Sequence, residues 1–113
     1  MKIPKHLQRR DMSAAQKRHV LEFVKERRKL LSQAPTYGTV EEATSAAVKL
    51  AKKEKYSFPS VWKEPEDIGE KHAVVHTDYI EDAYNAGYTQ EVEKQKIFDM
   101  ANGREEDDIE EVD

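Results

Sequence analysis

The chain has 113 residues, a formal net charge of −4 and no cysteine. This length suits one domain, and the lack of cysteine excludes disulfides, thiolate metal sites and cysteine nucleophiles. No apolar run approaches the length of a membrane span and the first residues lack the apolar stretch of a signal peptide, so we expect a cytoplasmic protein.

The apolar content is low for a folded domain. Leu, Ile, Val and Phe together account for 22 of the 113 residues, which is near the composition at which chains cease to bury enough apolar surface to fold. The core must therefore be small, and we expect a homodimer in which a second copy covers further apolar surface.

Charge is distributed unevenly along the chain. Residues 1–35 carry ten Lys or Arg and three acids, residues 36–77 are nearly balanced, and residues 78–113 carry thirteen acids and three basic residues. Such asymmetry is typical of a protein whose partner is selected by electrostatics.

Two helices are expected in the N-terminal half. Ser13 and Gln16 have the spacing of a capping box, and apolar residues then recur at helical spacing over residues 14–33. A second capping signal at residues 39–42 precedes a helix at residues 40–55, whose inner side is mostly alanine. The short turn between the two helices predicts an antiparallel helical hairpin.

The middle of the chain has few helical signals. Residues 56–71 contain two prolines and a glycine and are expected to be irregular, with Phe58, Val61 and Trp62 anchoring them to the hairpin. The apolar run at residues 73–76 predicts one short strand or an extended linker. A single strand needs a partner, which either the segment near Val61 or a second chain can supply.

Two shorter helices are expected near the C-terminus. Asp78 is a candidate N-cap for a helix at residues 79–86, and Thr89 for a helix at residues 90–101 that Gly103 would end. Apolar residues spread over more than half the circumference of the last helix. It therefore needs two apolar neighbours, and a partner subunit is one candidate.

The predicted fold is mainly α, with a helical hairpin, two shorter C-terminal helices, an irregular middle and at most one short strand. Its parts are a basic N-terminal arm at residues 1–12, a single helical domain at residues 13–103 and a flexible acidic tail at residues 104–113.

Catalytic motifs are missing from the sequence. His72 and His76 are four residues apart and are followed by Asp78 and Asp82, which would suit a metal only if this stretch were helical. The apolar run between the two histidines argues against a helix. The serines lack a glycine-flanked elbow, and the four glycines form no phosphate-binding loop. We therefore expect no enzyme activity, no metal and no cofactor.

A basic surface is expected on the arm and on the outer face of the first helix. It suits phosphate contacts without base readout, because Glu22 and Glu26 lie among the cations. Arg27 instead projects near the centre of the apolar stripe, where its stem can simply pass Phe23 and carry the guanidinium to solvent. The alternative is that Arg27 pairs with an acid or crosses a subunit interface. The candidate contact residues for nucleic acid or a partner are Arg9, Arg10, Arg18, Lys25, Arg28 and Lys29.

The last ten residues, REEDDIEEVD, form an anionic string. A flexible anionic string imitates a phosphate backbone and can occupy a basic groove. Ile109 and Val112 add an apolar anchor if the tail coils on binding. The alternatives are a tail that confers solubility and a tail that binds the chain's own basic helix. The acidic candidate residues are Glu105, Glu106, Asp107, Asp108, Glu110, Glu111 and Asp113.

In its size, lack of cysteine, high charge and absence of catalytic motifs, the chain resembles the small accessory proteins that bacteriophages make to bind host machinery. This compositional resemblance implies a partner such as RNA polymerase, a nucleoid protein, a replication factor or a protease complex. We therefore expect a non-enzymatic regulator or inhibitor that occludes a nucleic-acid-binding machine, most simply the transcription machinery, with its acidic tail as a nucleic-acid mimic. The alternative is a DNA-binding transcriptional regulator that uses the basic arm and the first helix.

Overall fold

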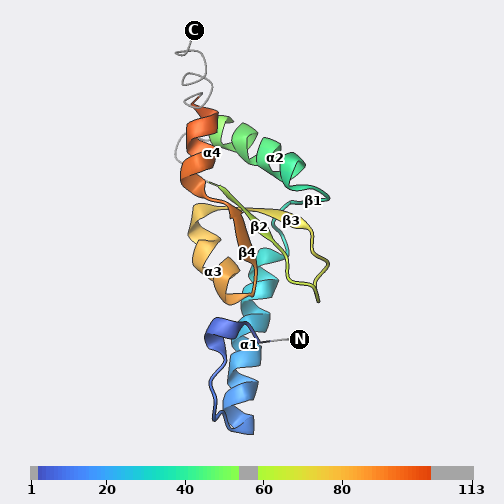
Figure 1. Cartoon of the computed structure of the whole chain (residues 1–113), viewed down its shortest axis with the longest axis vertical. Coiled ribbons are helices and arrows are strands. Elements are labelled where there is room, and N and C mark those ends of the chain that lie inside the picture. The colour runs from blue at the N-terminus through green and yellow to red at the C-terminus, as the bar shows by residue number, and fades with distance from the viewer. Residues whose placement is uncertain (1–2, 54–58, 103–113) are drawn as a thin grey trace.

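The computed structural model describes residues 3–53 and 59–102, which form a four-stranded antiparallel sheet flanked by helices (Figure 1). The strand order is β1-β3-β2-β4, so β2 pairs with the next strand along the chain, whereas each edge strand pairs with a strand that is not its neighbour in sequence. The strands are β1 (Thr36–Tyr37), β2 (Ser60–Lys63), β3 (His72–Val75) and β4 (Thr89–Val92). The prediction of a mainly α fold with one possible strand is therefore wrong, and the fold is mixed α/β.

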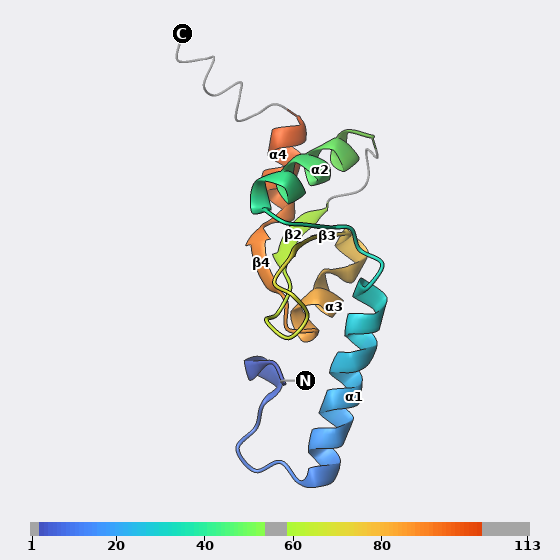
Figure 2. The same ribbon diagram turned by 90° about the vertical axis from the view of Figure 1, so that its right-hand side faces the viewer.

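Four helices cover the two faces of this sheet, and two single-turn 3-10 segments precede α1 and α3. The packing of buried side chains places α2 and α4 on one face, and α3 with the C-terminal end of α1 on the other. Figures 1 and 2 show this layering from two sides. The helical segments are η1 (Lys5–Leu7), α1 (Ala14–Leu31), α2 (Val40–Lys53), η2 (Thr77–Tyr79), α3 (Ile80–Asn85) and α4 (Lys94–Ala101).

The core has two halves because side chains alternate between the faces of a strand. Val61 and Val74 are paired across β2 and β3 and pack against the helices α2 and α4. Their neighbours Trp62 and Ala73, also paired, pack on the opposite side against α1 and α3. The small apolar content therefore serves two thin layers rather than one thick core.

The predicted α1–α2 hairpin is also wrong. Leu31 at the end of α1 belongs to one half of the core, whereas Ala43 and Ala47 of α2 belong to the other. The connection between the helices is more than a turn, because Thr36 and Tyr37 pair with β3. The chain thus crosses the edge of the sheet between the two helices.

The middle of the chain is only partly irregular. Within the segment predicted to lack structure, Ser60–Lys63 forms β2, one of the two central strands of the sheet. The predicted strand at residues 73–76 is β3, and its pairing with β2 confirms the segment near Val61 as a partner. Val61 and Trp62 are buried as expected, while Phe58 lies outside the described residues.

The last predicted helix is a strand followed by a shorter helix. Residues 89–92 form β4 against β2, with a register shift that inserts Glu91, and α4 begins only at Lys94. Ile97 is fully buried and packs with α2 and β2 side chains. The two apolar neighbours that this helix needs are therefore α2 and the sheet, so its apolar spread gives no argument for a second subunit. Gly103 lies outside the described residues.

The local capping signals agree with the structure better than the predicted topology does. The Ser13–Gln16 capping box is confirmed, with the Gln16 amide 3.1 Å from Ser13 Oγ and the Ser13 amide 2.8 Å from Gln16 Oε1. Thr39 caps α2 through the Glu42 amide at 3.2 Å.

The helix boundaries differ from the predictions by a few residues. α1 ends at Leu31 rather than at residue 33, and α2 is described to Lys53, so its predicted last two residues fall outside. Asp78 does not cap α3, because the turn η2 comes first and its cap is the His76 side chain.

Among residues 3–53 and 59–102, the helices are all too short or too polar to cross a membrane.

Candidate functional site

The N-terminal half of α1 and the arm before it project from the end of the molecule opposite to α4 (Figures 1 and 2). The arm is held against the end of α3. His6 Nε2 lies 3.1 Å from Asn85 Oδ1, and the His6 ring stacks on Tyr84 with centroids 3.9 Å apart. The arm is thus fixed to the body at residue 6, while the residues that follow lead out to the far end of α1.

Three of the six predicted basic contact residues lie on this projecting end, and the other three lie in the C-terminal half of α1. Arg9 and Arg10 are exposed in the arm, and Arg18, Lys25 and Lys29 are exposed on α1. Together with Lys5 and Lys17 they make seven exposed cations, against three exposed carboxylates, those of Asp11, Glu22 and Glu26. The surface is therefore positively charged and open to solvent.

Arg28 occupies a different environment from the other predicted basic residues. Its side chain is only 13% exposed, with Nη1 2.8 Å from Asp67 Oδ2 and Nε donating to the Ala86 carbonyl at 3.0 Å. Arg28 thereby caps the C-terminus of α3 and ties the β2–β3 loop to α1. Its guanidinium is engaged within the fold, so we leave it out of the candidate surface.

A helical projection would have indicated this role for Arg28. At 100° per residue Arg28 lies about 60° from the Val20–Val24–Leu31 stripe, whereas Arg18, Lys25 and Lys29 lie on the opposite side of the helix. A cation at the edge of an apolar stripe is placed to reach groups on the neighbouring element.

Gly87 allows the arm, α1 and α3 to meet at this junction. Its φ is +91°, and a Cβ added there would lie 3.3 Å from Pro4 Cγ and 3.6 Å from Arg28 Nη2. We expect Gly87→Ala to lower the free energy of unfolding by about 1–2 kcal/mol, because the left-handed conformation is costly for alanine and Pro4 must shift. Urea denaturation followed by circular dichroism measures this change.

Gly38→Ala is the matched control for Gly87→Ala. Nothing lies within 4 Å of a Cβ added at Gly38, so we expect a change within about 0.5 kcal/mol. Equal destabilisation by the two substitutions would contradict the proposed role of Gly87.

Arg27 pairs with an acid, which was one of the alternatives that the sequence left open. Its Nε lies 3.3 Å from Asp82 Oδ1 on α3, and its guanidinium lies 4.1 Å above the centre of the Phe23 ring. Arg27 and Arg28 therefore both fasten α1 to the C-terminal half of the chain.

The four residues considered for a metal form three separate contacts, one of them between His76 and Asp78. His72 Nδ1 lies 2.5 Å from Glu91 Oε1, His76 Nδ1 accepts from the Asp78 amide, and Asp82 pairs with Arg27. No group of three or more His, Cys, Asp or Glu side chains within residues 3–53 and 59–102 is arranged to hold a metal ion.

Tyr88 follows the junction and carries the clearest electrostatic perturbation in the described part of the chain. The side chain is only 6% exposed. Burial raises its pKa to about 12, with the nearby Glu64 carboxylate acting in the same direction and Arg28 opposing it. The phenol is therefore strongly held in its neutral form.

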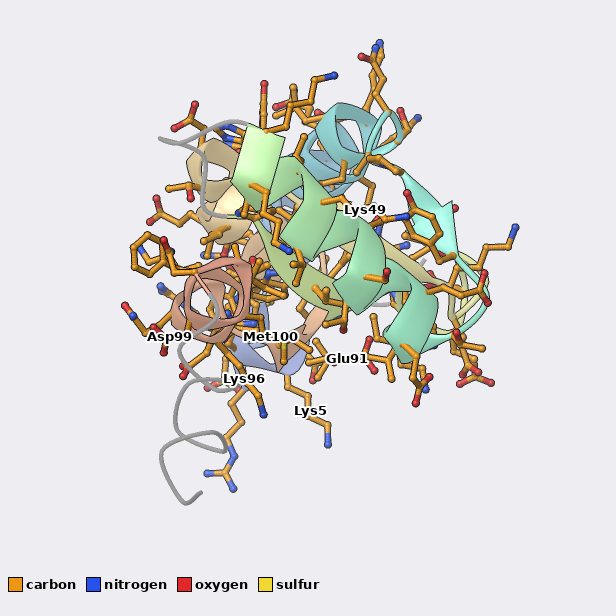
Figure 3. All side chains as sticks on the ribbon, turned by 90° about the horizontal axis from the view of Figure 1, so that it is seen from above. Lys5, Lys49, Glu91, Lys96, Asp99 and Met100 are labelled. Atoms are coloured by element: carbon orange, nitrogen blue, oxygen red, sulfur yellow. The ribbon has the colours of Figure 1, made fainter. Side chains whose placement is uncertain are left out.

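A second basic surface was missed by the sequence analysis. α2 and α4 diverge to leave a groove of about 650 Å³ with Lys49, Lys52 and Lys96 at its rim. Figure 3 looks down on this end of the molecule and marks Lys49 and Lys96 together with Met100. The outward residues of α2 alone form a mixed pattern, and Lys96 joins them only in the tertiary structure.

The seven acidic candidate residues, from Glu105 to Asp113, lie outside the described residues. The structure fixes the place from which they depart, since α4 ends at Ala101 beside α2.

Comparison with known proteins gives no match among family models, curated proteins or solved structures.

Proposed function

We propose that this protein is a non-enzymatic regulator of the cytoplasm that binds a nucleic-acid-processing machine at two places. One group of exposed cations lies on the N-terminal arm and α1, which projects at one end of the molecule, and the chain leaves α4 toward the acidic tail at the other end (Figure 1). This separation supports the proposal, because one molecule can then contact the nucleic acid with its cations and the basic surface of the nucleic-acid-binding machine with its tail.

The basic end suits phosphate groups rather than base edges. Arg18, Lys25 and Lys29 share one face of α1 over about 16 Å of helix, and Glu22 and Glu26 lie near them. A helix that reads bases needs neutral amide or arginine side chains directed into a groove, and acids among them would repel the backbone. We therefore infer contact with the nucleic-acid backbone without sequence preference.

The acidic tail suits the protein component of the machine. Seven carboxylates within the last ten residues give a charge density comparable with a nucleic-acid strand. A basic channel built to hold nucleic acid would attract this segment by the same forces. Binding there would occlude the channel, and transcription machinery such as RNA polymerase is the partner that we favour.

A second candidate function uses only the basic end. Within the described part of the chain, Arg9, Arg18 and Lys25 form no ion pair with a carboxylate. They are therefore available to DNA phosphates, and a DNA-binding regulator would need nothing from the tail.

Charge reversal at the basic end tests the nucleic-acid contact. We expect Arg18→Glu/Lys25→Glu to weaken binding of a labelled DNA duplex and to lower the slope of log K against log salt by about 2, one for each lost phosphate contact. Fluorescence anisotropy at several salt concentrations measures both quantities. Lys71→Glu/Lys94→Glu is the matched control, since it makes the same charge change at exposed positions elsewhere. An unchanged slope in the first variant would remove the basic end from nucleic-acid binding.

Neutralising the tail separates the two candidate functions. In the full chain, converting the seven tail acids to their amides should abolish binding to RNA polymerase while leaving DNA binding intact. If polymerase is bound equally well without the tail charges, the tail has no part in the function. If DNA alone is bound, the DNA-binding regulator is favoured.

A further inference from the structure

The groove between α2 and α4 is built for a ligand that is both acidic and partly apolar. Its floor is formed by Val40 and Val48 of α2 with Val92 and Met100 from the C-terminal segment. All four side chains are only half-buried, so an apolar ligand would remove further apolar surface from water.

The rim of the groove is positively charged. Lys49 and Lys52 stand on α2 and Lys96 on α4, all three exposed, with Glu41 as the one acid among the lining residues. Within residues 3–53 and 59–102, none of the three ammonium groups forms an ion pair. Three uncompensated cations around an apolar floor are typical of a site for an acidic peptide.

The chain itself carries such a peptide next to the groove. Residues 103–113 follow Asn102, two residues beyond the lining residue Met100. They contain seven acids and only two aliphatic residues, Ile109 and Val112. These two are three residues apart, with acids on both sides of them, so they would share one face if the segment formed a helical turn on binding.

The length of the segment suits an intramolecular site. Eleven residues span at most about 36 Å when extended, whereas the groove follows α2 from Val40 to Lys52, about 18 Å of helix. The tail can therefore reverse direction after α4 and still place both aliphatic residues over the floor. A short connection also keeps the entropic cost of closing the loop low.

The groove is a better site for the tail than the basic face of α1. The exposed face of α1 spreads Arg18, Lys25 and Lys29 along the helix, and only Lys29 of these three borders a hollow with the exposed apolar side chains of Leu30 and Tyr79. The N-terminal half of α1 lies at the opposite end of the molecule from α4 (Figures 1 and 2). Of the two surfaces, the groove is the one that offers several cations around an apolar floor and also lies next to the start of the tail.

We propose that the acidic tail of residues 103–113 docks into the α2–α4 groove of its own chain, with Ile109 and Val112 on the apolar floor and its carboxylates against Lys49, Lys52 and Lys96. The groove then acts as an internal competitor for any basic partner of the tail. This docking does not depend on the identity of a partner and can be tested without one.

Paramagnetic relaxation in the full chain tests the docking directly. Because the chain lacks cysteine, Glu110→Cys provides a single position for a spin label. We expect the amide signals of Thr44, Val48 and Met100 to lose most of their intensity, and signals around Arg18 to remain. Strong salt should restore the groove signals in part, since exposed charge pairs are screened.

Two sets of substitutions establish which groups hold the tail. Lys49→Glu/Lys52→Glu/Lys96→Glu should lower the ratio of docked to free tail about tenfold or more, and Ile109→Asp/Val112→Asp should release it similarly. The matched control, Arg18→Glu/Lys25→Glu/Lys29→Glu, makes the same charge change at the other end and should leave the broadening intact. All six cationic side chains are exposed, so these variants are expected to fold.

Several results would overturn the proposal. Absence of broadening in the groove, broadening confined to α1, or broadening that survives the groove substitutions would each exclude docking at this site. A mixture of spin-labelled copies without ¹⁵N and ¹⁵N-labelled copies without spin label should show no broadening. Broadening in that mixture would assign the groove to the tail of a second copy instead.

Discussion

Replacing Trp62 with alanine should lower the free energy of unfolding by about 3–5 kcal/mol, because a large buried aromatic side chain leaves a cavity behind. Trp62 is only 4% exposed and packs in the half of the core that joins the sheet to α1 and α3. Its indole also donates a 2.7 Å hydrogen bond to the buried Ser60 hydroxyl. Urea denaturation followed by far-ultraviolet circular dichroism measures the change, since the substitution removes the chain's one tryptophan.

Trp62→Phe separates packing from hydrogen bonding. Phenylalanine retains much of the apolar volume but leaves Ser60 without its donor, for which we expect a cost of about 1–2 kcal/mol. An alanine variant no less stable than the phenylalanine variant would show that Trp62 is not central to this half of the core.

Alkaline pH should destabilise the fold through Tyr88. The folded chain raises the pKa of Tyr88 from 10.0 to about 12, chiefly by burial, so it holds the phenolic proton more tightly than the unfolded chain does. Below pH 10 both forms are protonated and the fold has its full stability. As the pH rises from about 10 to 12 the unfolded chain loses the proton first, and about 2–3 kcal/mol of stability is lost.

Tyr88→Phe provides the control for this pH dependence. Other tyrosines and lysines titrate in the same range, so the relevant quantity is the difference in unfolding free energy between the two proteins at each pH. That difference should stay level below pH 10 and shift by about 2–3 kcal/mol in favour of the phenylalanine variant by pH 12. Parallel stability curves over the whole range would contradict the assignment.

The two proposed uses of the tail are linked by competition. If the tail occupies the α2–α4 groove in the free protein, a basic partner must compete with Lys49, Lys52 and Lys96 for the tail carboxylates. Variants of the groove should then bind the partner more tightly than the native chain does. Intramolecular attachment favours the groove through its high effective concentration, so a partner needs a denser basic surface to succeed.

The sequence by itself determined the features that depend on residues three or four positions apart. The start of α1 follows from the Ser13–Gln16 capping box, and the apolar stripe of α1 follows from its helical periodicity. The concentration of cations near the N-terminus and of acids near the C-terminus is likewise a property of the chain alone. These are local or additive signals, and folding does not alter them.

Only the tertiary structure decided the sheet and the partners of each helix. The strands have two to four residues each, too few to show a reliable period, and they are stabilised by neighbours far along the chain. The segment at residues 89–92 illustrates the reason: its local pattern suits a helix, but pairing with β2 makes it an edge strand. The roles of Arg28 and Lys96 also depend on contacts between distant parts of the chain. The Ala86 carbonyl and the Asp67 carboxylate bind the Arg28 guanidinium. Lys96 lines a groove only because α2 packs beside α4. A contact between residues distant in sequence forms only if its free energy exceeds the entropic cost of closing the intervening loop. A short stretch of sequence therefore does not predict which distant contacts form.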